Sequence, residues 1–81
     1  MDSSATTHNR LQTVFQTVFD DDNLTIFPDM TANDVDGWDS MMHINLIVAC
    51  EREFGVKFAL SEIAELPNVG ALEALIVQKL G

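Results

Sequence analysis

The sequence predicts a small all-α protein: a bundle of three main helices plus one short helix, with a long acidic loop between the first and second helices. Apolar residues recur at helical spacing in three separate segments, and no segment alternates as a strand does. Only two prolines and four glycines interrupt the 81 residues. A chain of this length forms one domain at most, residues 1–81, in which the polar residues 1–6 are expected to form a frayed tail.

The first helix is predicted from the segment "LQTVFQTVF", in which apolar side chains fall at positions i, i+3, i+4, i+7 and i+8. This spacing places them on one face of a helix. Thr6 or Thr7 is the expected N-cap, because a threonine hydroxyl accepts from the free N–H groups of a first turn. The helical periodicity of apolar residues ends before Asp20. The apolar stripe of this helix consists of Leu11, Val14, Phe15, Val18 and Phe19.

A long acidic loop is predicted for residues 20–39, which hold seven of the 13 acidic residues and no basic residue. Apolar residues also punctuate this segment, so we expect parts of it to pack on the core, and a loop of this length is usually functional. The Asp-rich run lacks the ligand spacing of a calcium loop, and we expect no metal site. The apolar residues are Leu24, Ile26, Phe27, Met30, Val35 and Trp38.

Capping residues mark the remaining three helices. The segment "SMMHINLIVACEREF" is predicted to form the second helix, with Asp39 as its N-cap and Gly55 as its C-terminal stop. A short helix in "SEIAEL" is expected to start at Ser61 and to end before Pro67. Asn68 is the expected cap of the last helix, "VGALEALIVQKL".

The second predicted helix carries two apolar stripes when it is projected at 100° per residue. One stripe is expected to face the core, and it consists of His43, Leu46, Ile47, Cys50 and Phe54. For His43 two positions stay open: it is a half-buried imidazole on the core side, or it lines the mouth of a pocket. The second row is Met41, Ile44 and Val48. We predict that it binds partner proteins; the alternative is that it covers the loop.

The charge of the chain restricts its partners. A net charge of −9 argues against nucleic acid and anionic membranes as ligands, because both require clustered Lys and Arg, whereas a basic partner protein fits. No apolar run is long enough to span a membrane. The single cysteine cannot form an internal disulfide, which is consistent with a reducing compartment. We expect a cytoplasmic monomer.

Ser40 stands where the acidic loop meets the second helix. The N-terminus of a helix favours negative charge, so a phosphate attached at its first turn is well placed, and Ser40 is positioned to carry a phosphoester. The alternative is that Ser40 only helps to cap the helix. A hydrolase triad of Ser40, His43 and Asp39 is disfavoured, because no oxyanion nest is evident and a helix is a poor nucleophile elbow.

Three segments resemble the acyl carrier protein family. Asp39-Ser40-Met41 is similar to the family's Asp-Ser-Leu motif, with Met in place of Leu. The segment "INLIVACEREFGVKF" resembles its second helix and the following loop, and "EIAELPNVGALEALI" its third and fourth helices. The resemblance covers roughly residues 8 to 80 and implies a four-helix bundle.

The resemblance implies that Ser40 carries a 4′-phosphopantetheine arm from coenzyme A, which makes the chain a phosphoprotein. The arm's thiol would hold acyl or aminoacyl groups as thioesters, so the chain would be a cosubstrate and not an enzyme. Asp39 would support the modification. The implied partners are a phosphopantetheinyl transferase, a loading ligase or acyltransferase, and a downstream synthase or transferase.

Two departures from the family pattern predict a specialised carrier rather than a housekeeping fatty-acid carrier. Trp38 replaces a smaller apolar residue, and the start of the second helix lacks the usual row of acids. The resemblance implies a role in fatty acid or polyketide biosynthesis. The two departures favour a carrier in secondary metabolism, in surface-polysaccharide synthesis or in amino-acid loading. The alternative function is an unmodified acidic helical module that binds a basic partner protein.

Overall fold

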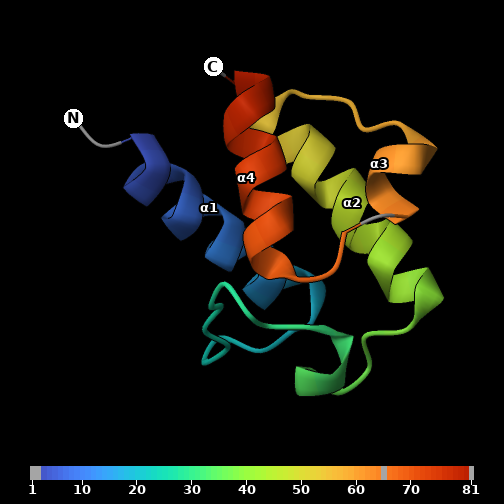
Figure 1. The fold of residues 1–81 in the computed structure, drawn as a ribbon. Helices are drawn as coiled ribbons and strands as arrows, with labels where there is room; N and C mark the ends of the chain where they lie inside the picture. Colours follow the sequence, from blue (N-terminus) through green and yellow to red (C-terminus); the bar gives the residue numbers. More distant parts are fainter. Residues whose placement is uncertain (1–2, 65, 81) are drawn as a thin grey trace.

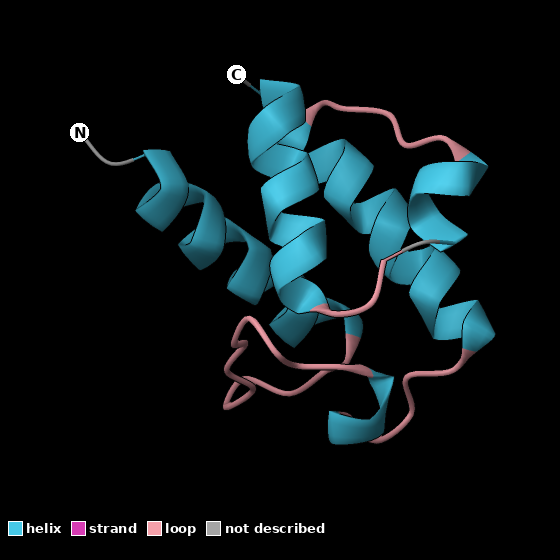
Figure 2. Cartoon of the chain, in the orientation of Figure 1, coloured by secondary structure: helices cyan, strands magenta, loops and turns pink. Residues whose placement is uncertain are grey.

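The computed structural model describes residues 3–64 and 66–80, and these form helices connected by loops (Figure 2). Four α-helices follow one another along the chain: α1 (Ser3–Val18), α2 (Ser40–Phe54), α3 (Leu60–Ala64) and α4 (Val69–Leu80). A short 3-10 helix, η1 (Ala32–Asp34), interrupts the long first connection. No strand occurs in these residues, so the predicted bundle of three main helices and one short helix is confirmed.

The core lies where α1 packs against α2 and α4 (Figure 1). Both predicted core stripes are buried there, apart from the half-buried Val18, Phe19 and His43. The loop contributes three further buried side chains, Ile26, Met30 and Val35, as expected from its apolar residues. The buried apolar residues are Leu11, Val14, Phe15, Ile26, Met30, Val35, Leu46, Ile47, Cys50, Phe54, Val69, Leu72 and Ile76.

The start of α1 differs from the prediction. The helix begins at Ser3, so Thr6 and Thr7 lie inside it and neither caps its N-terminus. No proline or glycine precedes Leu11, and the side chain of Thr7 is buried, so the helix continues toward the N-terminus. Residues 3–6 of the predicted tail therefore belong to α1, while its first two residues lie outside the described residues.

The helix termini confirm three of the predicted caps. The Asp39 carboxylate accepts from the N–H of Met42 at 2.9 Å, and Gly55 ends α2 in the left-handed conformation with φ 65°. The Asn68 side chain accepts from the N–H of Ala71 at 2.9 Å. The predicted start of α3 at Ser61 is wrong by one residue. Glu62 accepts from the N–H of Ala59 at 2.8 Å, which closes the first turn earlier.

Backbone hydrogen bonds attach the long loop to α4. The N–H of Val69 donates to the carbonyl of Met30 at 2.8 Å, and the N–H of Gly70 donates to the carbonyl of Pro28 at 2.9 Å. These two donors belong to the first turn of α4 and have no partner within that helix. A Cβ on Gly70 would lie 2.8 Å from the Pro28 oxygen, so only glycine permits this approach. The loop is thereby held against the start of α4.

Candidate functional site

Ser40 is the first residue of α2, and its side chain is exposed. Asp39 provides the N-cap, so the hydroxyl of Ser40 is not needed for capping, and no other described residue hydrogen-bonds to it. Gly37, with φ 84°, adopts the left-handed conformation that turns the chain into the helix. The structure therefore presents an exposed hydroxyl at the positive end of a helix dipole.

Trp38 anchors the loop immediately before Ser40. Its ring packs edge-on against Phe15, with ring centres 5.5 Å apart, and against Phe19 at 5.8 Å. Its indole N–H donates to Nδ1 of His43 at 3.3 Å. These contacts connect the loop to α1 and to the first turn of α2, and they confirm the prediction that Trp38 is partly buried.

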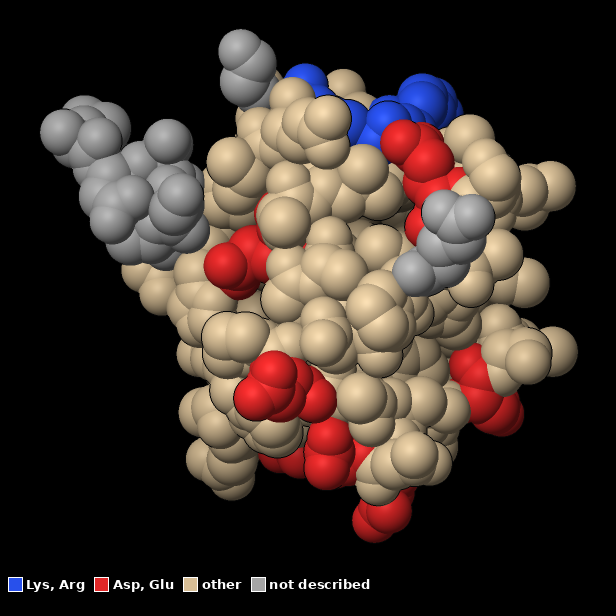
Figure 3. Space-filling model, viewed as in Figure 1, with Lys and Arg blue, Asp and Glu red and all other residues tan. Residues whose placement is uncertain are grey.

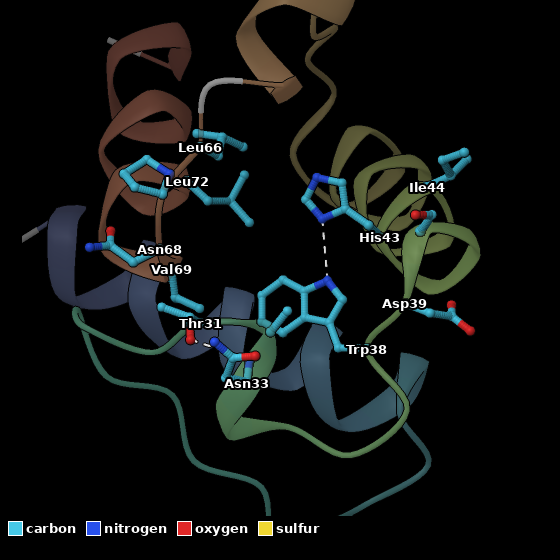
Figure 4. Close-up of a pocket in the computed structure, with 13 residues that line it drawn as sticks. Thr31, Asn33, Trp38, Asp39, His43, Ile44, Leu66, Asn68, Val69 and Leu72 are labelled. Carbon is cyan, nitrogen blue, oxygen red and sulfur yellow. Dashed lines mark hydrogen bonds between the residues drawn. The ribbon is translucent and has the colours of Figure 1, made fainter.

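A cavity of about 630 Å³ opens beside Ser40. Figure 4 shows its walls: η1 and Trp38 on one side, the first turns of α2 on another, and the start of α4 opposite. The lining is mainly apolar toward α4, where Leu66, Val69 and Leu72 contribute. The full lining is Thr31, Ala32, Asn33, Trp38, Asp39, Ser40, His43, Ile44, Leu66, Pro67, Asn68, Val69 and Leu72.

The sequence did not predict which residues complete this cavity. The side contributed by η1 follows from a capping box, in which Thr31 accepts from the N–H of Asn33 and Asp34 accepts from the N–H of Thr31. The Thr-x-x-Asp pattern is visible in the sequence. The side contributed by residues 66–68 depends on the hydrogen bonds that hold the start of α4 against the loop, which no local pattern reveals.

His43 is half-buried, as expected, and its side chain lines this cavity. The hydrolase triad does not form. Nδ1 of His43 accepts from Trp38, and the Asp39 carboxylate accepts from the N–H of Met42. Among the described residues, no group of three or more His, Cys, Asp or Glu side chains could hold a metal ion.

The two stripes of α2 have opposite exposures. Met41, Ile44 and Val48 are exposed by 72%, 62% and 42%. The opposite stripe, from Leu46 to Phe54, is buried. The second row therefore does not cover the loop, and it forms an exposed apolar strip next to Ser40.

Charge is distributed unevenly over the molecule. In Figure 3 the basic side chains gather at one end of the visible face, and acidic side chains dominate the opposite end, where the long loop lies. The long loop, residues 20–39, holds seven acidic residues and no basic residue. The described helices are too short or too polar to cross a membrane.

Cys50 is fully buried between the helices. Burial raises the pKa of its thiol to about 12, and the nearby charges of Glu51 and Glu53 add to the effect. The thiol is therefore protonated at neutral pH and is a poor nucleophile. Its role is to fill the core, as predicted.

Comparison with known proteins identifies the family. The family model described as "phosphopantetheine attachment site" matches residues 9–76. The solution NMR structure of a holo acyl carrier protein from Geobacter metallireducens is 46% identical, with a TM-score of 0.86; the match covers 91% of this chain and 85% of that one. A comparison with curated protein sequences found no match.

These findings favour a carrier over the alternative of an unmodified interaction module, because the family match includes the Asp39-Ser40-Met41 motif and nearly the whole bundle. The chain therefore belongs to the phosphopantetheine attachment family, and it is a carrier protein bearing covalent 4′-phosphopantetheine, not an enzyme.

Proposed function

We propose that the 4′-phosphopantetheine arm is attached to the hydroxyl of Ser40 through a phosphoester. The observation that carries this proposal is the division of roles at the start of α2, where Asp39 caps the helix and Ser40 keeps an exposed hydroxyl. The attached phosphate would lie at the positive end of the α2 dipole, which stabilises an anion. Asp39 next to it supports the modification by fixing the first turn.

The arm's thiol holds an acyl or aminoacyl group as a thioester and delivers it to partner enzymes. The cavity beside Ser40 supports this function, because it offers an apolar space next to the attachment point. The NMR neighbour is itself titled a holo acyl carrier protein, which supports an acyl cargo. Trp38 beside this cavity and the absence of acids early in α2 favour a specialised pathway, such as secondary metabolism, over housekeeping fatty-acid synthesis.

Partner enzymes bind the exposed strip formed by Met41, Ile44 and Val48. The strip lies on the same helix as Ser40, so an enzyme bound to it is next to the arm. Exposed contiguous apolar side chains usually mark an interaction surface, and methionine adapts to several partners. The partners are a phosphopantetheinyl transferase, a loading ligase or acyltransferase, and a downstream synthase or transferase, and all act in the cytoplasm.

Intact-mass measurement after incubation with coenzyme A and a broad-specificity phosphopantetheinyl transferase tests the attachment site. The wild type should gain one phosphopantetheine, and Ser40→Ala should gain none. Ser61→Ala is the matched control, because Ser61 is also an exposed serine in the first turn of a helix. Full modification of Ser40→Ala, or loss of modification in Ser61→Ala, would contradict the assignment.

A further inference from the structure

We propose that His43 donates a hydrogen bond from Nε2 to a carbonyl oxygen of the group that enters the cavity beside Ser40, and so favours carbonyl-bearing guests over plain alkyl chains. The proposal rests on the proposed function, because the guest is covalently linked to Ser40. The carbonyl has two possible sources, an amide of the phosphopantetheine arm or an oxygen on the acyl cargo.

The contact with Trp38 determines which nitrogen of His43 carries the proton. The indole N–H of Trp38 points at Nδ1 of His43, 3.3 Å away. An indole nitrogen only donates, so Nδ1 has to accept and has no proton of its own. In this contact the ring proton is therefore on Nε2. Trp38 thus makes His43 a directed N–H donor.

The position of Nε2 leaves this donor available to a guest. In Figure 4 the His43 ring extends from α2 into the cavity, with its second nitrogen on the side away from Trp38. None of the described residues accepts a hydrogen bond from that nitrogen, whereas every fully buried side-chain nitrogen or oxygen among them has a partner. Nε2 is therefore reachable from the cavity.

The surroundings of His43 make its donor selective. Leu66 and Leu72 line the cavity across from the ring, and Trp38 closes one side. The Asn68 oxygen is engaged by the N–H of Ala71, and its amide lies away from His43 in Figure 4. An alkyl guest that fills this space displaces water and leaves the N–H without an acceptor, which costs stability. A guest carbonyl at this depth removes that cost.

Melting temperatures of loaded proteins test the proposal. Wild type, His43→Leu and His43→Gln are each prepared as the apo form, the holo form, and the hexanoyl and 3-oxohexanoyl forms, loaded from the corresponding coenzyme A thioesters. Intact mass first establishes that each guest is attached, so a failure of loading counts against Ser40 as the attachment site and not against His43. Leu removes the donor, whereas the side-chain amide of Gln places an N–H near the position of Nε2.

We expect the 3-oxohexanoyl form of the wild type to melt about 4–8 °C above its hexanoyl form. His43→Leu should lose this difference, and His43→Gln should recover part of it. If the arm is the source of the carbonyl, the wild-type holo form melts above the apo form by a margin that His43→Leu lacks, and the two acyl forms coincide. Each comparison is made within one variant, so the loss of the Trp38 contact in His43→Leu cancels.

The wild type also gives an independent readout that no substitution disturbs. The ¹⁵N resonance of His43 Nε2 should shift when the holo or 3-oxohexanoyl group is attached, while Nδ1 keeps its acceptor signature. The proposal is overturned if the Nε2 resonance is the same in all four forms. It is equally overturned if His43→Leu retains the full melting differences of the wild type.

Discussion

Two adjacent residues divide the tasks at the start of α2. The Asp39 carboxylate accepts a hydrogen bond from the N–H of Met42 in the first turn. The hydroxyl of Ser40 is therefore not needed as a cap, and it is exposed. The Asp39 cap could be assigned from the sequence, because an acid followed by an apolar helical stripe marks a cap. Attachment of the arm to Ser40 stays a prediction. The contact between Trp38 and His43 could not be assigned from the sequence, since it depends on rotamers that only the packed structure defines.

Cys50 should be inert in the folded protein. Burial raises its pKa to about 12, so an alkylating reagent should modify the native apo protein only through unfolding. The holo protein should instead react once, at the thiol of the arm. Mass measurement after brief treatment with iodoacetamide checks this, and rapid single modification of native apo protein would contradict it.

The same shift in pKa predicts how stability depends on alkaline pH. The thiol is harder to ionise in the folded state than in the unfolded state, so the unfolded state binds fewer protons between about pH 9 and about pH 12. Stability should therefore be complete below about pH 9 and should fall as the pH rises through this window. In urea unfolding, Cys50→Ala should be less stable at neutral pH and should lose less stability on going to high pH.

Ile44 and Ile47 form a matched pair on α2, since the two identical side chains are 62% and 3% exposed. Ile44→Asp should change the free energy of unfolding by less than about 0.5 kcal/mol, as is usual at the surface. Ile47→Asp buries an unpaired charge and should cost more than about 4 kcal/mol, enough to unfold the domain. Equilibrium denaturation compares them.

The proposed binding strip adds a functional expectation to this pair. Ile44→Asp should remain folded yet lose loading by its cognate ligase or acyltransferase, because an acidic group replaces an apolar contact. An Ile44→Asp variant that is loaded at the wild-type rate would show that the strip is not the binding surface.

At the level of elements, the attachment of the loop to α4 depends on Gly70. An exposed Gly in a helix usually gains about 0.5–1 kcal/mol of stability on replacement by Ala. Here the added Cβ would meet the backbone oxygen of Pro28 at 2.8 Å, so the sign should reverse. Gly70→Ala should destabilise the protein by about 1–3 kcal/mol, as overpacking does.

Hydrogen exchange locates the effect of this substitution. Gly70→Ala should accelerate exchange at the amides of Val69 and Met30 and in the adjoining loop, while the amides of α1 stay protected. Ala74→Ser is the control, because Ala74 is an exposed position on the same helix. A stabilised Gly70→Ala variant would show that the loop adapts without cost.

Local patterns predicted the elements where caps and periodicity agree. Asp39 and Gly55 gave the bounds of α2, and Asn68 the start of α4. The start of α1 was missed because Thr6 and Thr7 are equally compatible with a cap and with a helix interior. The start of α3 was misplaced because Glu62, not Ser61, closes its first turn.

For the molecule as a whole, the separation of charge has a thermodynamic consequence. Seven acids lie in residues 20–39 with no basic residue among them, so they repel one another in the folded protein. Raising the ionic strength from about 0.01 M to about 0.15 M shortens the Debye length from about 30 Å to about 8 Å. The melting temperature should therefore rise with added NaCl, and calorimetry that shows a steady fall would contradict this interpretation.

The whole-molecule arrangement was predictable only in part. Helical periodicity identified the residues of the core, and the composition predicted the acidic end. The cavity beside Ser40 was not predictable, because its walls come from η1, α2 and the segment before α4, which are distant in sequence. Packing alone brings Leu66 and Leu72 opposite His43.

The central claim is that Ser40 carries the arm, and peptide mass spectrometry of the modified wild-type protein tests it most directly. Reduction and alkylation of Cys50, followed by cleavage before aspartate and after arginine, releases residues 39–52, in which Ser40 has the only hydroxyl. We predict that this peptide, and no other, carries the mass of 4′-phosphopantetheine with its thiol alkylated. An unmodified 39–52 peptide from fully modified protein would contradict the account.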